Sequence, residues 1–374
     1  MSNDMNLGNI PVLSAGQCVD LLSNMYINYI NKGISFNTLP SVMLWGAPGI
    51  GKSQSIRQIA DAIAMKTYKK VNVTDVRLIL FNPIDLRGIP TANESKTLAV
   101  WLKPKIFQMD PSSNVVNILF LDEISAAPLS VQAAAYQITL DKTVGEHKLP
   151  DNCIVIAAGN RTTDKSVAYA MPKALSNRLL HLEVDAIIDA WGKWAVQHDI
   201  HPMVTGFLKF KPNYLMQFNT NASTLAFATP RTWEMVSNIL KTVSSDLDIV
   251  YDLIAGLVGK AITVEFKTWS KIYRNLPNMD DIFNGLRADV PTRGDVCYAV
   301  ISSMVAYAKL HKDNMRKIEN SIAYAMKLPP EYSTILLKDY IYLEDGYMNK
   351  LLKIPTFSRW LQTRGKLLDE LNGK

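Results

Sequence analysis

A glycine-rich segment near the start of the chain constrains the fold more than any other feature of the sequence. Residues Gly46–Ser53 read GAPGIGKS and match the pattern GxxxxGK[ST]. The apolar run Ser41–Trp45 precedes this segment and the amphipathic stretch Ser53–Lys66 follows it, which predicts a buried strand, a tight loop and a helix. Such a loop points successive backbone N–H groups, together with the positive end of the helix, at phosphate oxygens. The sequence therefore predicts an α/β unit with a phosphate site.

Two side chains of this loop have individual roles in the prediction. Lys52 would neutralise the β- and γ-phosphates of a nucleoside triphosphate, and the Ser53 hydroxyl suits a Mg²⁺ ion that bridges them. The alternative is a structural turn with an N-capping serine, and the strand and helix on its two sides argue against it. The predicted nucleotide-binding residues of the loop are Gly46, Ala47, Pro48, Gly49, Ile50, Gly51, Lys52 and Ser53.

Two adjacent carboxylates end a second apolar run. Ile118–Leu121 leads directly into Asp122 and Glu123. At the carboxyl edge of a parallel sheet, Asp122 is expected to hold Mg²⁺ and to contribute to nucleotide binding. Glu123 is then free to polarise an attacking water molecule, which favours hydrolysis over simple nucleotide binding. The alternative is that both carboxylates cap a helix.

Asn160 follows a third apolar run, Cys153–Gly159. Its neutral side chain is able to orient water or to contact a terminal phosphate. Taken alone, an Asn after a Gly is more typical of a turn. The assignment of Asn160 to the site therefore depends on the other motifs.

The rest of the chain predicts an α/β core followed by helices. Residues 1–190 are expected to form the nucleotide-binding core, residues 191–260 a linker and helical lid, and residues 261–374 a C-terminal helical extension. Five short runs predict a five-stranded parallel sheet with helices on both faces: Ser41–Trp45, Leu78–Phe81, Val115–Leu121, Cys153–Ala158 and Leu180–Val184.

Composition excludes several classes of protein. The chain has 374 residues, of which 48% are hydrophobic and 20% charged, so it has enough apolar residues to bury a core. The net charge of +6 is too small to indicate nucleic-acid binding by itself. The three cysteines show no metal-binding or disulfide spacing, and Met1–Pro11 lacks the pattern of a signal peptide. No apolar stretch reaches membrane-spanning length, so a cytoplasmic protein without membrane insertion is expected.

In this order, the motifs resemble those of the AAA+ ATPases, and more closely those of the MoxR family within them. The run from Asp122 to Gln132, DEISAAPLSVQ, is similar to that family's Walker B block. Thr143–Pro150 resembles its following hairpin, and Asp85–Pro90, followed by the Trp101 region, resembles an insertion typical of this clade. The resemblance spans about residues 7–243. It implies a P-loop AAA+ core followed by a lid, with ATP and Mg²⁺ as ligands.

The resemblance also implies three further catalytic residues. Asn160 matches the sensor-1 position, although Arg161 stands where the family commonly has proline. Arg178 matches the arginine finger that reaches the ATP of a neighbouring subunit, with Leu179 in place of the usual phenylalanine. Arg231 matches the sensor-2 arginine of the lid. Together with Glu123, these three residues are the predicted catalytic set.

The function implied by the resemblance is that of a chaperone-like remodeller. The family implies a homo-oligomeric ring, expected to be a hexamer, that acts on a separate protein partner, for instance one with a von Willebrand factor A domain. Two alternatives stay open at this stage: a nucleic-acid motor, and a nucleotide-gated scaffold without useful turnover. Another pattern, His198-Asp199-Ile200-His201, has HxxH spacing but shows no third ligand, so the sequence predicts no zinc site there.

Overall fold

The computed structural model describes residues 8–161, 171, 176–217 and 224–364. The chain divides into two compact units, Met1–Asp185 and Ala186–Lys374. The first unit contains every strand that the structure describes, and in the described part of the second unit the regular elements are all helical. No helix in the described ranges is both long and apolar enough to cross a membrane.

The first unit is built on a parallel sheet, as the sequence predicts. Its interior strands are apolar and buried along almost their whole length, as is typical of strands covered on both faces. The sheet has six strands in the spatial order β1-β10-β2-β9-β6-β3. Their bounds are β1 (Val12–Ser14), β2 (Val42–Trp45), β3 (Lys70–Arg77), β6 (Val115–Asp122), β9 (Cys153–Gly159) and β10 (Leu180–Asp185).

Both edges of the sheet differ from the five-stranded prediction. The run Leu78–Phe81, predicted as a strand, holds a 3-10 helix, η2 (Leu78–Leu80), and the edge strand β3 precedes it. This strand lies at the end of the sheet and has no continuous apolar run, because most of its side chains are at least partly exposed. The opposite edge strand, β1, has only three residues, so it leaves almost no periodic signal in the sequence.

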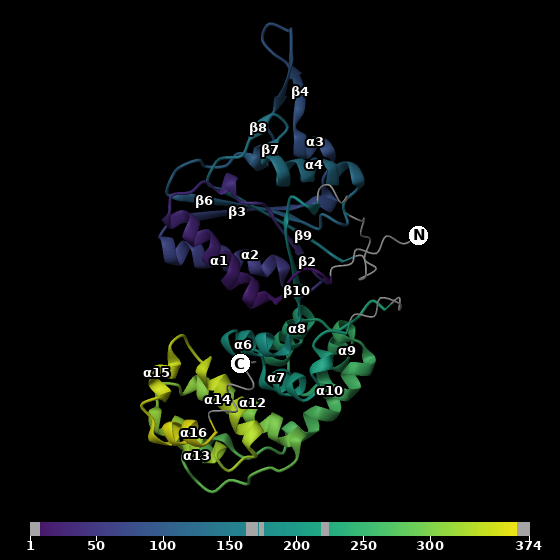
Figure 1. The fold of residues 1–374 in the computed structure, drawn as a ribbon. Coiled ribbons are helices and arrows are strands. Elements are labelled where there is room, and N and C mark those ends of the chain that lie inside the picture. The colour runs from purple at the N-terminus through teal and green to yellow at the C-terminus, as the bar shows by residue number, and fades with distance from the viewer. Residues whose placement is uncertain (1–7, 162–170, 172–175, 218–223, 365–374) are drawn as a thin grey trace. The chain divides into compact units, whose positions relative to one another are not determined.

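Helices cover the two faces of this sheet. Figure 1 shows α1 (Ala15–Asn31) and α2 (Lys52–Thr67) on one face, and α3 (Pro83–Arg87) and α4 (Leu129–Asp141) on the other. Two hairpins belong to the same unit, and one of them lies within Thr143–Pro150, where the sequence predicts a hairpin. They are formed by β4 (Ile89–Ala92) with β5 (Ala99–Leu102), and by β7 (Thr143–Val144) with β8 (His147–Lys148). The short 3-10 helices η1 (Phe36–Thr38) and η3 (Lys105–Phe107) complete this unit.

The helices of the second unit surround two apolar cores. The first core is rich in aromatic side chains, and Phe207, Trp233 and Phe266 pack together with ring centroids 5.1–5.6 Å apart. Its helices are α6 (Ile188–Gln197), α7 (Pro202–Phe210), η5 (Pro212–Tyr214), α8 (Pro230–Thr242), α9 (Leu247–Val258) and α10 (Lys260–Tyr273).

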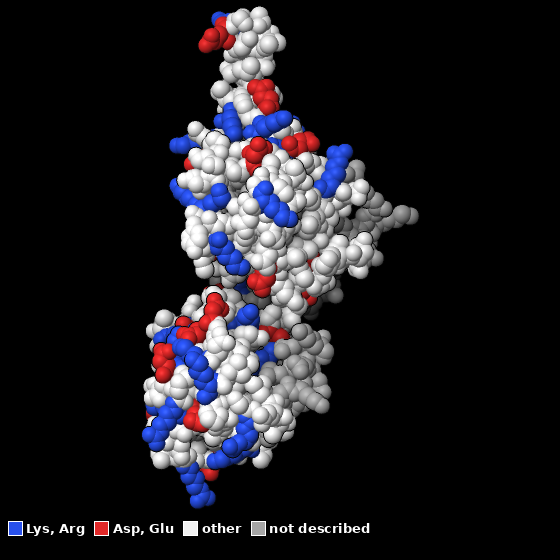
Figure 2. All heavy atoms as spheres, turned by 60° about the vertical axis from the view of Figure 1, so that its left-hand side comes forward, with Lys and Arg blue, Asp and Glu red and all other residues white. Residues whose placement is uncertain are grey.

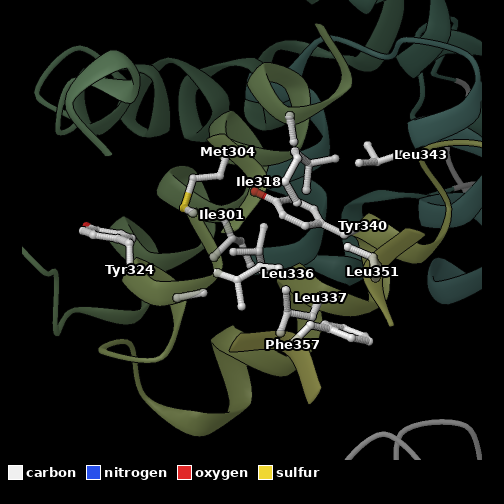
Figure 3. Close-up of a cluster of buried hydrophobic side chains, with 14 of the residues drawn as sticks. Ile301, Met304, Ile318, Tyr324, Leu336, Leu337, Tyr340, Leu343, Leu351 and Phe357 are labelled. Carbon is white, nitrogen blue, oxygen red and sulfur yellow. The ribbon is translucent and has the colours of Figure 1, made fainter. Parts of the chain in front are cut away.

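The second core lies toward the C-terminus (Figure 3). Side chains from several helices converge there, among them Ile301, Ile318, Leu337, Tyr340 and Phe357. The helices are α11 (Met279–Phe283), α12 (Gly294–Leu310), α13 (Met315–Ala325), α14 (Pro330–Ile341), α15 (Tyr347–Leu351) and α16 (Pro355–Arg364). A buried ion pair between Lys209 of α7 and Asp339 of α14 joins the two groups of helices.

Candidate functional site

The glycine-rich loop begins directly after β2, at the carboxyl edge of the sheet. Gly46 donates its N–H to the carbonyl of Gly159, at the end of the neighbouring strand β9, over 3.3 Å. A Cβ atom at Gly46 would lie 2.4 Å from the carbonyl oxygen of Val184 on β10. Only glycine therefore fits between these strands without moving the backbone.

The loop ends where α2 begins. Gly49 and Gly51 have φ angles of 80° and 104°, values that glycine adopts without steric penalty. The first backbone bond of the helix runs from the Ser55 N–H to the Gly51 carbonyl over 2.9 Å. The N–H groups that precede Ser55 consequently have no acceptor inside the helix. This arrangement fits the binding of an anion such as phosphate.

Lys52 joins the loop to Asn160. Its side chain is only 8% exposed, and its Nζ donates to the carbonyls of Gly46 and Ala47 and to Oδ1 of Asn160, the last over 3.1 Å. Lys52 lies at the start of α2 and Asn160 directly after β9, so the sheet edge brings together residues 108 positions apart. In the sequence, Lys52 and Asn160 belong to two separate motifs, and nothing there shows that they are in contact.

Ser53 and Asp122 are likewise distant in the sequence and in contact in the structure. The Ser53 hydroxyl donates to Oδ2 of Asp122 over 2.9 Å. A hydroxyl and a carboxylate side by side form a hard oxygen donor set of the kind that Mg²⁺ prefers. The residues present therefore fit the ion that the sequence predicts.

Glu123 adopts an uncommon backbone conformation. Its φ angle is 58°, in the left-handed region, where a residue with a Cβ atom is strained by about 1–2 kcal/mol. Its N–H donates to Oδ1 of Asp122 over 2.9 Å, and its carbonyl accepts from Ala126. Strain of this kind is often retained at functional sites, because it fixes the direction of a reactive side chain.

Ser125 belongs to this arrangement, although the sequence analysis assigned it no role. Its hydroxyl accepts from the backbone N–H of Asn160 over 2.9 Å. The neighbouring Ile124 N–H donates to the carbonyl of Ala158 over 2.9 Å. The turn after Asp122 is thus tied to the end of β9 by two hydrogen bonds. A serine two residues after Glu123 is too common to be recognised without the structure.

Asp75 adds a further carboxylate that sequence reasoning missed. Burial and then the charge of Asp122 raise the pKa of Asp75 above its usual value, while Arg77 and Arg57 act in the opposite direction. Asp75 lies on β3, whose alternating pattern was not recognised as a strand. The acidic character of this edge of the sheet therefore extends beyond Asp122.

The predicted arginine finger lies at the amino ends of the strands, whereas the glycine-rich loop lies at their carboxyl ends. Arg178 is exposed and occupies the turn that precedes β10. Leu180 pairs with Val42 at the start of β2, whereas the glycine-rich loop follows the end of that strand. Because all six strands are parallel, Arg178 lies near their amino ends, away from the glycine-rich loop. Residues 174 and 175 of its motif fall outside the described part of the chain.

Two other arginines have different surroundings. Arg231 is exposed in the first turn of α8, where Thr229 and Thr232 form a capping box. It belongs to the second unit, so its role toward the loop stays a prediction. Arg161, which replaces the proline common in the family, forms an ion pair with Glu183 on β10, with an N–O distance of 2.5 Å.

The two histidines of the HxxH pattern contact backbone groups. His198 Nδ1 lies 2.9 Å from the carbonyl of Trp194, and His201 Nδ1 accepts from the N–H of Met203 at the start of α7. Within the described ranges, no group of three or more His, Cys, Asp or Glu residues is arranged to hold a metal ion. Both histidines contact backbone groups near the ends of α6 and α7.

His201 predicts a pH dependence of stability. Burial, and then the charge of Lys241, lowers its pKa from 6.5 to about 4. Because the unfolded state binds the proton more tightly, this contribution is complete above about pH 6.5 and is lost as the pH falls through about 4. We expect urea unfolding, followed by circular dichroism, to lose about 2–3 kcal/mol over this window. His201→Asn, which keeps a capping oxygen but does not titrate, should lose less; an equal loss would contradict the assignment.

Part of the first unit is similar to a known protein family. Residues 41–181 match the sequence model of the family described as "ATPase family associated with various cellular activities (AAA)". The match includes the glycine-rich loop, Asp122, Glu123, Asn160 and Arg178. It covers less than half of the chain. Over these residues the chain is therefore similar to this ATPase family.

Solved structures from three organisms are similar to the chain. The ORC2 protein of Aeropyrum pernix has 12% sequence identity and a TM-score of 0.39, over 91% of this chain and 90% of that one. A putative ATPase from Cytophaga hutchinsonii has 16% identity and a TM-score of 0.30, over 86% and 88%. A RuvB mutant from Thermotoga maritima has 14% identity and a TM-score of 0.36, over 79% and 86%. No curated protein matches the sequence.

Proposed function

We propose that this chain is an ATP-hydrolysing AAA+ protein that forms a ring and remodels or activates a separate protein partner. The observation that carries the hydrolytic part is the meeting of three motifs at one edge of the sheet. Lys52 donates to Asn160, and Ser53 donates to Asp122. The family match over residues 41–181 supports the same assignment.

Each of these side chains has a role in the proposed reaction. The N–H groups of the loop and Lys52 hold the β- and γ-phosphates, while Ser53 and Asp122 hold Mg²⁺. The ion would neutralise charge that develops on the phosphate oxygens. Glu123 accepts a proton from the attacking water, and Asn160 orients that water or contacts the γ-phosphate. The phosphates held by Lys52 and the Mg²⁺ held by Asp122 would then both lie at the carboxyl ends of the strands.

The position of Arg178 supports the proposed assembly into a ring, with a hexamer as the expected form. This arginine lies near the amino ends of the strands, so in the proposal it serves the ATP of a neighbouring subunit. Isolated subunits would hydrolyse ATP slowly, and turnover would increase on assembly. Arg231, on the lid, would act on the nucleotide bound by the core.

The resemblance to the MoxR family supports a protein as the partner, for instance one with a von Willebrand factor A domain. On the face drawn in Figure 2, Lys and Arg side chains are separated by uncharged surface and by Asp and Glu side chains. A nucleic-acid motor would show tight binding to DNA or RNA that weakens steeply with salt. A salt titration with both nucleic acids that gave this result would favour the alternative.

Lys52→Ala tests the nucleotide site directly. We expect it to weaken the binding of ATP with Mg²⁺ by at least about tenfold, since one charge-assisted phosphate contact contributes about 1.5–3 kcal/mol. Equilibrium binding of a fluorescent ATP analogue measures this, and phosphate release follows turnover. Unchanged binding would contradict the proposed site.

Lys142→Ala is the matched control. Lys142 is also 8% exposed, and its Nζ donates to the backbone carbonyls of Phe36 and Leu39. It caps α4 and takes no part in the proposed site. We expect this variant to lose stability but to bind ATP like the parent. Loss of binding in both variants would show that burial of a lysine, and not phosphate contact, determines the result.

A further inference from the structure

A hydrogen bond joins the end of β2 to β10 next to the glycine-rich loop. Trp45, the last residue of β2 before Gly46, donates its indole N–H to Nδ1 of His181 over 2.9 Å. The indole and imidazole rings are stacked, with an interplanar angle of 14°. Trp45 is only 2% exposed, and a buried indole N–H needs such an acceptor.

The other side of the His181 ring contacts the turn that holds Arg178. Its Nε2 lies 2.7 Å from the carbonyl oxygen of Ser176 and 3.3 Å from the hydroxyl of the same residue. The Ser176 carbonyl also accepts from the N–H of Leu179, which closes a turn with Asn177 and Arg178 at its tip. His181 therefore binds the carbonyl that shapes this turn.

These partners determine how the imidazole is protonated. Nδ1 must accept, because the indole N–H of Trp45 only donates. Nε2 then carries the proton and donates to the Ser176 carbonyl. A neutral imidazole with one donor and one acceptor satisfies both neighbours, and few other side chains have this combination at this length.

Through these contacts His181 links the carboxyl end of β2 to the turn before β10. Trp45 lies at the carboxyl end of β2, beside the loop, whereas Ser176 and Arg178 lie near the amino end of β10. The loop would hold the ATP of its own subunit, and Arg178 would act on the ATP of the next one. The side chain of His181 thus contacts both the strand before the loop and the turn of Arg178.

From this geometry we infer that His181 is a positioning residue that holds the Arg178 turn in place against the strand carrying the phosphate loop. This inference rests on the proposed function, since it requires Arg178 to act in a neighbouring subunit. Small displacements of a catalytic group lower turnover strongly while binding of substrate is preserved. Loss of His181 should therefore lower kcat and leave the KM for ATP nearly unchanged.

The test uses two inactive variants that complement each other. Lys52→Ala subunits keep Arg178 but bind ATP poorly, and Arg178→Ala subunits bind ATP but lack the finger. In mixed rings, activity arises where a Lys52→Ala subunit presents Arg178 to an Arg178→Ala neighbour. His181→Phe, which keeps a stacked ring but neither hydrogen bond, is then added to one partner or to the other.

We expect the position of His181→Phe in the mixture to decide its effect. In the subunit that supplies Arg178, it should lower phosphate release by about tenfold. In the subunit that binds ATP, the loss should be at most about twofold. His181→Gln, whose amide both accepts and donates, should restore part of the activity. Equal losses in the two positions, or no loss in either, would overturn the inference.

Two comparisons keep these outcomes distinct. If the mixture of Lys52→Ala and Arg178→Ala shows no more activity than the separate variants, the proposed role of Arg178 fails, and the inference fails with it. His147→Phe is the matched control, because His147 Nε2 also lies 2.7 Å from a backbone carbonyl, that of Trp101, but belongs to the β7–β8 hairpin. In the subunit that supplies Arg178, it should leave activity unchanged. A tenfold loss there would contradict a specific role for His181.

Discussion

Arg178→Ala is expected to lower ATP turnover of the assembled protein by about 10³-fold. An arginine from a neighbouring subunit neutralises charge on the γ-phosphate in the transition state, and such residues contribute about 10³–10⁵ in rate. ATP binding should change little, because the Arg178 of a subunit lies away from the glycine-rich loop of that subunit. Phosphate release measured over a range of protein concentrations tests this.

The concentration dependence is the informative part of this measurement. Turnover per subunit of the parent protein should increase with concentration as rings assemble, and that of Arg178→Ala should stay low throughout. Arg316→Ala, which removes another exposed arginine from α13, controls for the loss of one positive charge. If Arg178→Ala turns over as fast as the parent at assembling concentrations, Arg178 is not the finger.

Glu123→Gln is expected to lower phosphate release by about 10²–10⁴-fold while ATP binding is retained. The amide keeps the size of the side chain but cannot accept a proton from water, and general base catalysis contributes a factor of this order. Because Mg²⁺ binding is assigned to Ser53 and Asp122, the nucleotide should still be held. Single-turnover phosphate release and equilibrium ATP binding separate the two effects.

Retained ATP makes the same variant useful for finding the partner. A ring that binds ATP without hydrolysing it should keep its protein partner bound, and a pull-down followed by mass spectrometry would identify that protein. Glu146→Gln is the control, since Glu146 is a carboxylate of the β7–β8 hairpin that accepts the backbone N–H of Trp101 over 3.1 Å. Equal phosphate release by Glu123→Gln and the parent would remove Glu123 as the base.

The central strands and the helix after the loop were predictable because burial on two faces leaves a strong local pattern. The predicted runs at Ser41–Trp45 and Val115–Leu121 match β2 and β6 to within one residue. Edge strands have weaker patterns, because they are partly exposed or very short. For that reason β3 was placed too late in the chain and β1 was not predicted.

The supporting residues of the site were not predictable for a different reason. Ser125, Asp75 and His181 lie near motif residues in space but have no spacing or composition that marks them. The left-handed backbone conformation of Glu123 could not be predicted from the sequence either, because glutamate adopts it only where surrounding contacts impose it. The contacts of these residues depend on which strands lie next to each other in the sheet.

By itself, the sequence determined that this chain contains a glycine-rich loop between a strand and a helix, followed by two carboxylates at the end of another strand. These features are local, since each depends on residues close together in the chain. Only the tertiary structure decided that Lys52 reaches Asn160, that Ser53 reaches Asp122, and that Arg178 lies at the other edge of the sheet. The physical reason is the order of the parallel strands, which determines which strand ends are neighbours and which edge each loop occupies.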